Sequence, residues 1–197
     1  MVRKFKIVFI GPDGSGKTTL INFFRAKLES EGNSAESFFM GWRDFSNPVL
    51  KISSKIYLKN KSEEKDKERI DRYKPRSWFF YFIYYSELWL RYLKVLASNK
   101  NYILFDRYFY DELLFSSKSK FNFFSKITPK PDLCFILRPS IKLLMDRNQK
   151  VSERKLAHFY KRLNKVSKLC NSCFIDGSQS PSEIYLKFKN LKYGQLH

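Results

Sequence analysis

The residues with the clearest chemical meaning form a glycine-rich run near the start of the chain. Residues 11–18 read Gly-Pro-Asp-Gly-Ser-Gly-Lys-Thr and match the phosphate-binding pattern G-x-x-x-x-G-K-[ST] at every fixed position. In such a loop, backbone N–H groups surround nucleotide phosphates, Lys17 reaches the terminal phosphates and the Thr18 hydroxyl binds Mg²⁺. The residues expected to hold the phosphates of ATP are Gly11, Asp13, Gly14, Ser15, Gly16, Lys17, Thr18 and Thr19.

A carboxylate in the position expected of a second metal ligand ends an apolar run far along the chain. Residues 102–106 read Tyr-Ile-Leu-Phe-Asp, four hydrophobic residues followed by Asp106. In a protein with a phosphate-binding loop, a strand of this form brings its aspartate close to Mg²⁺. Arg107 follows directly, where its guanidinium can bind two phosphate oxygens at once. Thr18 and Asp106 are therefore the predicted metal ligands.

Short apolar runs alternate with helical patterns, and the glycine-rich run lies between one of each. Residues 5–10 form a near-continuous apolar run of strand length, and apolar residues recur at helical spacing over 18–29. Further strand-like runs lie at residues 37–40, 102–105, 133–137 and 173–175. This alternation predicts an α/β fold, with a parallel sheet covered by helices on both faces.

Length and composition indicate one globular domain over residues 1–197. With 43% hydrophobic and 29% charged residues, the chain is unlike disordered, fibrous or disulfide-dense secreted proteins. The charge-dense stretch at 59–74 is interpreted as a solvated insert. The longest apolar run, 78–85, is far shorter than the roughly 20 residues that span a bilayer. With three cysteines and no signal-peptide pattern, we expect a cytoplasmic protein.

Two features of the composition are unusual: a formal net charge of +19 and an aromatic content of 18%. The charge has two interpretations, an anionic partner or the lysine-rich bias of an A+T-rich genome. Because the chain shows no nucleic-acid-binding motif, a nucleic-acid partner is not expected. The aromatic segment 78–96 is interpreted as a core helix or as a helix pressed against a membrane surface. Weak association with an anionic membrane, and so a peripheral location, stays open.

At four places the sequence resembles the thymidylate kinase family of P-loop kinases. They are Gly11 to Thr19, Asp106-Arg107-Tyr108, Pro131-Asp132-Leu133 and Phe174-Ile175-Asp176-Gly177, in the family's order. The resemblance implies a three-layer α/β/α sandwich around a five-stranded parallel sheet, with a helical lid. It also implies a kinase that transfers the γ-phosphoryl group of ATP, with Mg²⁺, to the phosphate of dTMP, and commonly a homodimer.

The resemblance carries roles onto individual residues. Asp13 matches the acidic loop residue that hydrogen-bonds the 3′-hydroxyl of the acceptor, and Arg107 matches the phosphate-binding arginine. The lid is placed at about residues 147–154, where Arg147 and Arg154 would supply the basic groups that the loop itself lacks. The implied catalytic set is Lys17, Asp13, Asp106, Arg107, Arg147 and Arg154, and the implied substrate-binding set is Asp13, Arg43, Arg107 and Tyr108.

The departures from the family pattern fall on the acceptor side. Residues 41–48 stand where the family has Arg-Glu-Pro, and Arg43 is the candidate substitute, with Trp42 or Phe45 as a stacking surface. The run Tyr84-Tyr85-Ser86-Glu87 occupies the place of an arginine that grips the acceptor phosphate. Arg91 follows one to two helical turns too late and is expected to face elsewhere.

Three functions remain open from the sequence. The first is transfer to a nucleoside monophosphate, with dTMP as the default acceptor. The second is transfer to a sugar or glycan hydroxyl, which needs a base because a hydroxyl must lose a proton; the candidates are Asp13, Glu87 and Asp111. The third is a module that binds ATP without transferring phosphate.

Overall fold

The computed structural model describes residues 4–41, 45–52, 78–114, 116–147 and 153–193. The side chains of Glu112, Lys155 and Tyr193 are not described. The predicted insert at 59–74, the substrate-binding candidate Arg43 and the middle of the predicted lid lie outside these residues.

A five-stranded parallel sheet in the order β2-β3-β1-β4-β5 forms the centre of the fold. The strands are β1 (Phe5–Ile10), β2 (Ala35–Phe39), β3 (Tyr102–Asp106), β4 (Leu133–Arg138) and β5 (Ser172–Asp176). The apolar run of β1 lies at the centre of the sheet, and its last four residues are buried. A parallel strand covered on both faces needs such a run, so the sequence pattern follows from the position of the strand.

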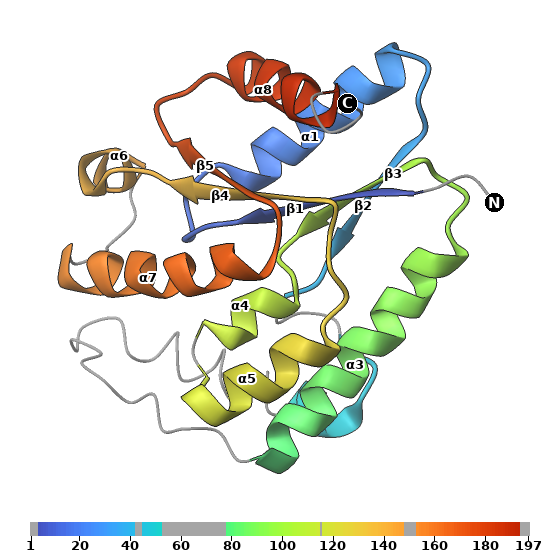
Figure 1. Ribbon diagram of the computed structural model, residues 1–197, viewed down its shortest axis with the longest axis vertical. Helices are drawn as coiled ribbons and strands as arrows, with labels where there is room; N and C mark the ends of the chain where they lie inside the picture. Colours follow the sequence, from blue (N-terminus) through green and yellow to red (C-terminus); the bar gives the residue numbers. More distant parts are fainter. Residues whose placement is uncertain (1–3, 42–44, 53–77, 115, 148–152, 194–197) are drawn as a thin grey trace.

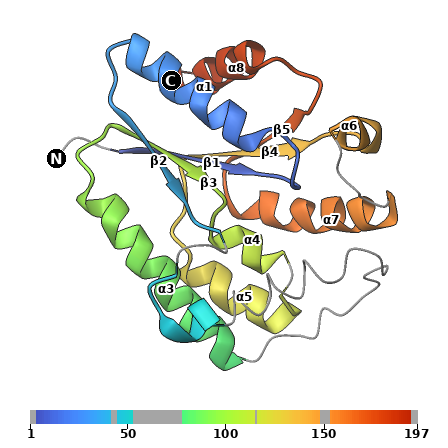
Figure 2. The same ribbon diagram turned by 180° about the vertical axis from the view of Figure 1, so that it is seen from behind.

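Helices cover both faces of the sheet (Figure 1 and, from behind, Figure 2). On one face lie α1 (Lys17–Ser30) and α8 (Pro181–Tyr193). On the other lie α3 (Trp78–Ala97), α4 (Phe109–Leu113), α5 (Lys118–Ile127) and α7 (Glu153–Val166), while α6 (Ile141–Asp146) follows β4. The predicted three-layer α/β/α sandwich is confirmed.

Two aromatic-rich cores, one on each face of the sheet, account for much of the aromatic content. Phe24 of α1 contacts Phe9, Phe135, Tyr185 and Phe188 on one face. On the other face, Phe124 of α5 contacts Tyr81, Tyr85 and several further rings. Edge-on and tilted ring pairs of this kind stabilise a core beyond the area they bury.

The strand order places the loops after β1, β3 and β4 at one edge of the sheet. Phe9 of β1 is in register with Asp106 of β3, and Ile10 is in register with Ile136 of β4. The chain leaves β1 toward β2 on one side and later returns to its other side as β4, so β1 ends at a switch in connection direction. Ligands of open α/β sheets bind in the crevice at such a switch point.

Among the helices of the described residues, none is both long enough and apolar enough to span a bilayer.

Candidate active site

The glycine-rich loop joins the end of β1 to the start of α1 and depends on backbone positions that exclude side chains. Gly16, directly before α1, has φ = +87°, a left-handed conformation that glycine adopts without strain. A Cβ atom on Gly11 would lie 2.9 Å from Ser15 Oγ and 3.0 Å from the Leu137 backbone oxygen. The loop is therefore packed tightly against the end of β4.

Lys17 is folded back onto its own loop. Its Nζ donates hydrogen bonds to the carbonyl oxygens of Gly11 at 3.0 Å and Pro12 at 2.8 Å, and it lies 3.4 Å from Ser15 Oγ. The side chain is buried, and this burial, together with the nearby charge of Arg107, lowers the pKa of Lys17 to about 8. An anion placed at the loop would restore the preference of this amine for its charged form.

The side chains of Thr18, in α1, and Asp106, at the end of β3, are joined by a hydrogen bond. Thr18 Oγ1 donates to Asp106 Oδ2 at 3.0 Å. Within the described residues, no group of three or more histidine, cysteine or acidic side chains could hold a metal ion.

Arg107 forms ion pairs with two carboxylates. Its guanidinium donates to Asp111 Oδ1 at 2.9 Å and to the carboxylate of Asp13, while the Tyr108 amide donates to Asp111 Oδ2 at 2.9 Å. Burial disfavours the charged form of Arg107, but Asp111 and Asp13 outweigh it and raise the pKa of the guanidinium. Arg107 also has φ = +70°, an uncommon conformation for a residue with a Cβ atom. The strand therefore ends in a strained turn that the two carboxylates help to hold.

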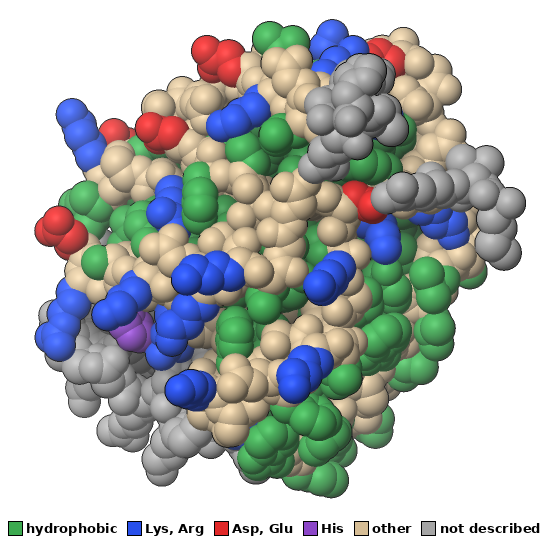
Figure 3. Space-filling view, viewed as in Figure 1, with side chains coloured by type: hydrophobic (Ala, Val, Ile, Leu, Met, Phe, Trp, Pro, Cys, Tyr) green, Lys and Arg blue, Asp and Glu red, His purple; other side chains and the backbone are tan. Residues whose placement is uncertain are grey.

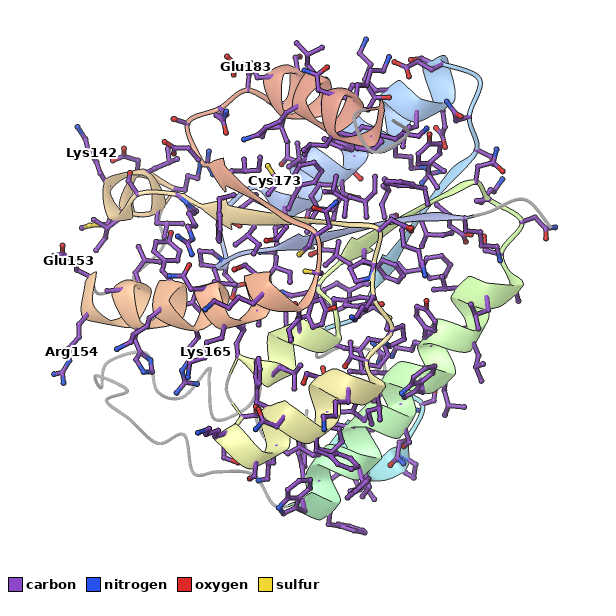
Figure 4. The ribbon with its side chains drawn as sticks, viewed as in Figure 1. Lys142, Glu153, Arg154, Lys165, Cys173 and Glu183 are labelled. Carbon is purple, nitrogen blue, oxygen red and sulfur yellow. The ribbon has the colours of Figure 1, made fainter. Side chains whose placement is uncertain are left out.

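The two predicted lid arginines lie differently. Arg147, directly after α6, donates to the Gly14 carbonyl oxygen at 3.0 Å and so reaches the glycine-rich loop. Arg154 is exposed in the first turn of α7 and projects away from the sheet (Figure 4). The structure thus brings Asp13, Lys17, Thr18, Asp106, Arg107 and Arg147 together and leaves Arg154 outside the group.

Comparison with known proteins places this chain in a family. A sequence model described as thymidylate kinase matches residues 9–185. The chain belongs to the thymidylate kinase family. It is accordingly an ATP-dependent phosphotransferase, and the family acts on nucleotides. No curated protein sequence matches the chain.

The fold has a solved relative in the thymidylate kinase of Candida albicans. That structure aligns with 98% of this chain and 92% of its own, with a TM-score of 0.65 and 17% sequence identity. The Candida enzyme is described as having broad substrate specificity and a novel structural element. At this identity the likeness supports the fold alone.

Tyr108 of the family's Asp-Arg-Tyr pattern turns away from the other candidates. Its side chain is fully buried, and its hydroxyl donates to the Pro129 carbonyl oxygen at 2.9 Å. The ring packs against Phe105 and Phe109 in the core. This position corrects the prediction of a substrate contact, because the ring has no exposed surface. Of the three consecutive residues, Asp106 bonds to Thr18, Arg107 forms the ion pairs and Tyr108 enters the core.

Glu87 stands where this chain lacks the family's acceptor arginine, and it supports a loop. Its two oxygens accept hydrogen bonds from the backbone amides of Ser46 at 2.9 Å and Asn47 at 3.1 Å, and Arg91 Nε lies 3.2 Å from Oε1. Burial alone would raise the pKa of Glu87, but these hydrogen bonds outweigh it and lower the pKa. Glu87, a candidate base in the sequence, is buried here and holds the Ser46–Asn47 backbone.

Arg91 takes part in the same arrangement. It donates to the Gly41 carbonyl oxygen at 3.1 Å, and its guanidinium lies 5.0 Å from the centre of the Phe45 ring. Phe45 is buried, so its ring packs in the core. The sequence could not show this arrangement, because the partners of Glu87 and Arg91 include backbone groups about 40 to 50 residues away.

A hollow of about 510 Å³ lies at the ends of β4 and β5, and the sequence did not identify it. It is lined by Arg138, Phe174, Ile175, Asp176 and Gln179. The Arg138 guanidinium stacks on the Phe174 ring at 3.9 Å. Arg138 directly follows Leu137, which packs against Gly11, so the hollow adjoins the glycine-rich loop. The only sequence signal was the polar residue that ends each strand.

Proposed function

We propose that this kinase transfers the γ-phosphoryl group of Mg²⁺-bound ATP to a nucleoside monophosphate, with dTMP as the default acceptor. The observation that carries the proposal is the meeting of Lys17, the Thr18–Asp106 pair and Arg107 at one edge of the sheet. These groups come from the ends of β1 and β3, which the parallel register brings side by side. Phosphoryl transfer relies mainly on positioning and on charge stabilisation, and this cluster supplies both.

Lys17 and the loop are assigned to the donor. The hydrogen bonds from Lys17 Nζ to the Gly11 and Pro12 carbonyl oxygens can be exchanged for bonds to phosphate oxygens. Arg147, which already contacts the Gly14 carbonyl oxygen, lies where it can bind the same phosphates. The hollow lined by Arg138 and Phe174 offers a guanidinium–ring surface beside the loop, suited to a flat base.

Thr18 and Asp106 are assigned to Mg²⁺. Their oxygens lie 3.0 Å apart, and hard oxygen donors are the ligands this ion prefers. Mg²⁺ normally keeps several waters and phosphate oxygens, so two protein ligands are sufficient. When bound there, the ion would withdraw charge from the β- and γ-phosphates.

Arg107 and Asp13 are assigned to the acceptor. The ion pairs with Asp13 and Asp111 hold the Arg107 guanidinium in one orientation before any substrate binds. An acceptor phosphate would share this cation, while Asp13, whose side chain is 70% exposed, can accept a hydrogen bond from a sugar hydroxyl. Arg43 and Arg154 keep their predicted roles only as proposals.

A second candidate, transfer to a sugar or glycan hydroxyl, is favoured by the state of the acceptor-side cations. Arg91 is engaged with Glu87 and Gly41, and Arg107 is already paired with two carboxylates. A hydroxyl acceptor needs a base rather than a further cation. Asp13 is the exposed carboxylate of the group, whereas Glu87 is occupied by backbone amides and Asp111 by Arg107 and the Tyr108 amide.

The experiment that separates these functions measures ADP release from ATP and Mg²⁺ with dTMP, other nucleoside monophosphates, nucleosides and simple sugars. The expected result is turnover that depends on a nucleoside monophosphate. Turnover only with a nucleoside or sugar would favour the hydroxyl acceptor. If the protein binds ATP but none of these compounds increases ADP release, both proposed kinase functions would be contradicted.

A further inference from the structure

Two of the three cysteines lie together on one face of the sheet. Cys134, in β4, is fully buried, and Cys170, between η1 (Ser167–Leu169) and β5, is partly exposed. Cys134 is part of the core on the face that α3, α5 and α7 cover, and Cys170 packs against that core. The Cys134 amide donates to the Asn171 carbonyl oxygen at 2.8 Å, and Cys134 is in register with Ser172. The residue that follows Cys170 is therefore bonded directly to Cys134.

The side chains of Cys134 and Cys170 interact as well. A hydrogen bond from the Cys134 thiol lowers the pKa of Cys170, against the effect of burial. Burial, and next the same hydrogen bond, raises the pKa of Cys134. Tyr110 of α4 lies beside both sulfur atoms, and burial together with these neighbours raises the pKa of its hydroxyl. The pair thus combines one thiol that ionises more readily with one buried thiol that stays protonated.

The sequence alone suggests a different pair of cysteines. Cys170-Asn-Ser-Cys173 has the C-x-x-C spacing of redox motifs. In the structure, however, Cys173 is in register with Phe135 and packs in the core on the other face of the sheet, which α1 and α8 cover. Figure 4 shows the labelled Cys173 on the α8 side of the sheet. The sheet therefore separates Cys173 from Cys170, whereas Cys134 and Cys170 share one face.

The surface near Cys170 is positively charged. Lys165 and Lys168 are exposed on α7 and η1, the two elements that precede Cys170. Figure 3 shows basic side chains spread over the face that α7 crosses, while the acidic side chains visible in that view lie in its upper half. Positive charge near a thiol favours the thiolate, which is the form that reacts with oxidants. Redox-sensitive cysteines are typically accessible, low in pKa and placed beside a second thiol, and Cys170 has these three properties.

We propose that Cys134 and Cys170 form a reversible disulfide when the protein meets a peroxide. The Cys170 thiolate attacks one oxygen of hydrogen peroxide, the O–O bond breaks, and the sulfur becomes a sulfenic acid. The hydroxide that leaves becomes water with the proton that Cys170 has released. The Cys134 sulfur then attacks the Cys170 sulfur, the S–O bond breaks, and the second hydroxide leaves as water with the Cys134 proton. The two thiols lose two electrons in total, and the peroxide gains them.

A dithiol reductant reverses the oxidation by thiol–disulfide exchange. The inference is independent of the phosphoryl acceptor, because none of its residues is assigned to ATP, Mg²⁺ or the acceptor.

The test is to treat the reduced full-length protein with hydrogen peroxide, to block the remaining thiols with N-ethylmaleimide and to map the peptides by mass spectrometry. We expect one intramolecular disulfide, between Cys134 and Cys170, with Cys173 alkylated. Because this bond would close a long loop, the oxidised protein should unfold at a temperature about 5 °C higher or more. Dithiothreitol should reverse both changes.

Cys173→Ser is the matched control and should form the same disulfide with the same shift in unfolding temperature. Cys134→Ala should form no intramolecular disulfide and should instead leave a sulfenic acid at Cys170, which dimedone traps. Circular dichroism melting of each reduced variant verifies that it is folded.

Three results with the wild-type protein, which need no variant, would overturn the proposal. One is a disulfide between Cys170 and Cys173. Another is alkylation of all three cysteines after peroxide treatment, with no disulfide. The third is oxidation of Cys170 to a sulfinic acid without a disulfide, because Cys134 would then be out of its reach.

Discussion

The proposed donor side and the proposed acceptor side of the site are built in different ways. On the proposed donor side, Gly16, Lys17 and Thr18 are consecutive, and the hydrogen bonds of Lys17 stay within the one loop between β1 and α1. On the acceptor side, Glu87 and Arg91 of α3 hold the backbone of Gly41, Ser46 and Asn47. The donor side therefore keeps the pattern of the thymidylate kinase family, while the acceptor side is supported by contacts between distant segments.

The two kinds of support place different demands on the sequence. A phosphate-binding loop tolerates little change, because its glycines are required by backbone conformation and close packing. A loop held by side-chain carboxylate bonds to backbone amides places no demand on the identity of the residues whose amides it holds.

The largest expected effect comes from Lys17→Ala on the donor side. Loss of the cation that binds the transferring phosphate should reduce kcat by about a thousandfold or more. The fold should stay intact, because Lys17 contacts only its own loop and its buried charge costs free energy. Steady-state kinetics with circular dichroism melting measures both quantities. Wild-type turnover in this variant would remove Lys17 from the mechanism.

Arg107→Ala addresses the acceptor side. If Arg107 binds the acceptor phosphate, kcat/KM for dTMP should fall about 10- to 100-fold, the value of a lost charged hydrogen bond. The loss should be much smaller for any nucleoside or sugar that the enzyme accepts. The comparison needs kcat/KM for both acceptor classes in wild-type and variant protein. Equal losses for the two classes would remove the assignment of Arg107 to the acceptor.

Glu87→Gln tests whether the acceptor-side loop depends on its buried carboxylate. The amide would turn an NH₂ group toward a backbone N–H donor and leave Arg91 without its countercharge. The variant should lose about 3 kcal/mol of stability in denaturant unfolding. Because folding lowers the pKa of Glu87, its stabilisation is present above the ordinary value of about 4.5 and is lost as the pH falls below it. The gap between wild type and variant should therefore shrink in acid, and a constant gap would contradict this reasoning.

ATP binding should take up a proton at mildly alkaline pH. The pKa of Lys17 is about 8 in the free protein, and bound phosphates would raise it. ATP affinity should therefore weaken as the pH rises through 8, and calorimetry at about pH 8.5 in buffers of different ionisation enthalpy should show proton uptake. Lys17→Arg, whose guanidinium stays charged, is the matched control. Proton uptake of the same size in that variant would assign the effect to another group.

The smallest expected effect separates the two roles of Arg107. Glycine relieves the left-handed backbone conformation at this position, so Arg107→Gly should be more stable than Arg107→Ala by about 1 kcal/mol. Both variants lose the same ion pairs with Asp13 and Asp111, so the difference isolates the backbone. Thermal unfolding of the two variants side by side measures it. Equal stability would mean that the turn after β3 is unstrained.

Much of the fold could be predicted from local sequence. The strands at the centre of the sheet are apolar runs that end in a glycine or a polar residue, and all five predicted strand positions lie within two residues of those observed. The meeting of Thr18 with Asp106 could also be anticipated, because parallel strands bring their ends to one edge. Each of these features depends on residues that are adjacent in the sequence.

The remaining features depend on tertiary contacts that no spacing reveals. Tyr108 directly follows Arg107 of the ion-pair cluster, yet its side chain is buried in the core. The support that Glu87 gives to the loop could not be predicted, since its backbone partners are some 40 positions away in sequence. The sequence also did not show which face of α3 is buried, because apolar residues lie on its exposed face as well as on its buried face.

The most direct test of the account is identification of the product formed from ATP, Mg²⁺ and dTMP by phosphorus NMR. If the proposed donor site serves a nucleoside monophosphate, the wild-type protein should give the paired resonances of a second nucleoside diphosphate besides those of ADP. The Lys17→Ala protein should give neither set. Release of ADP with inorganic phosphate alone, or the same product from the Lys17→Ala protein, would contradict it.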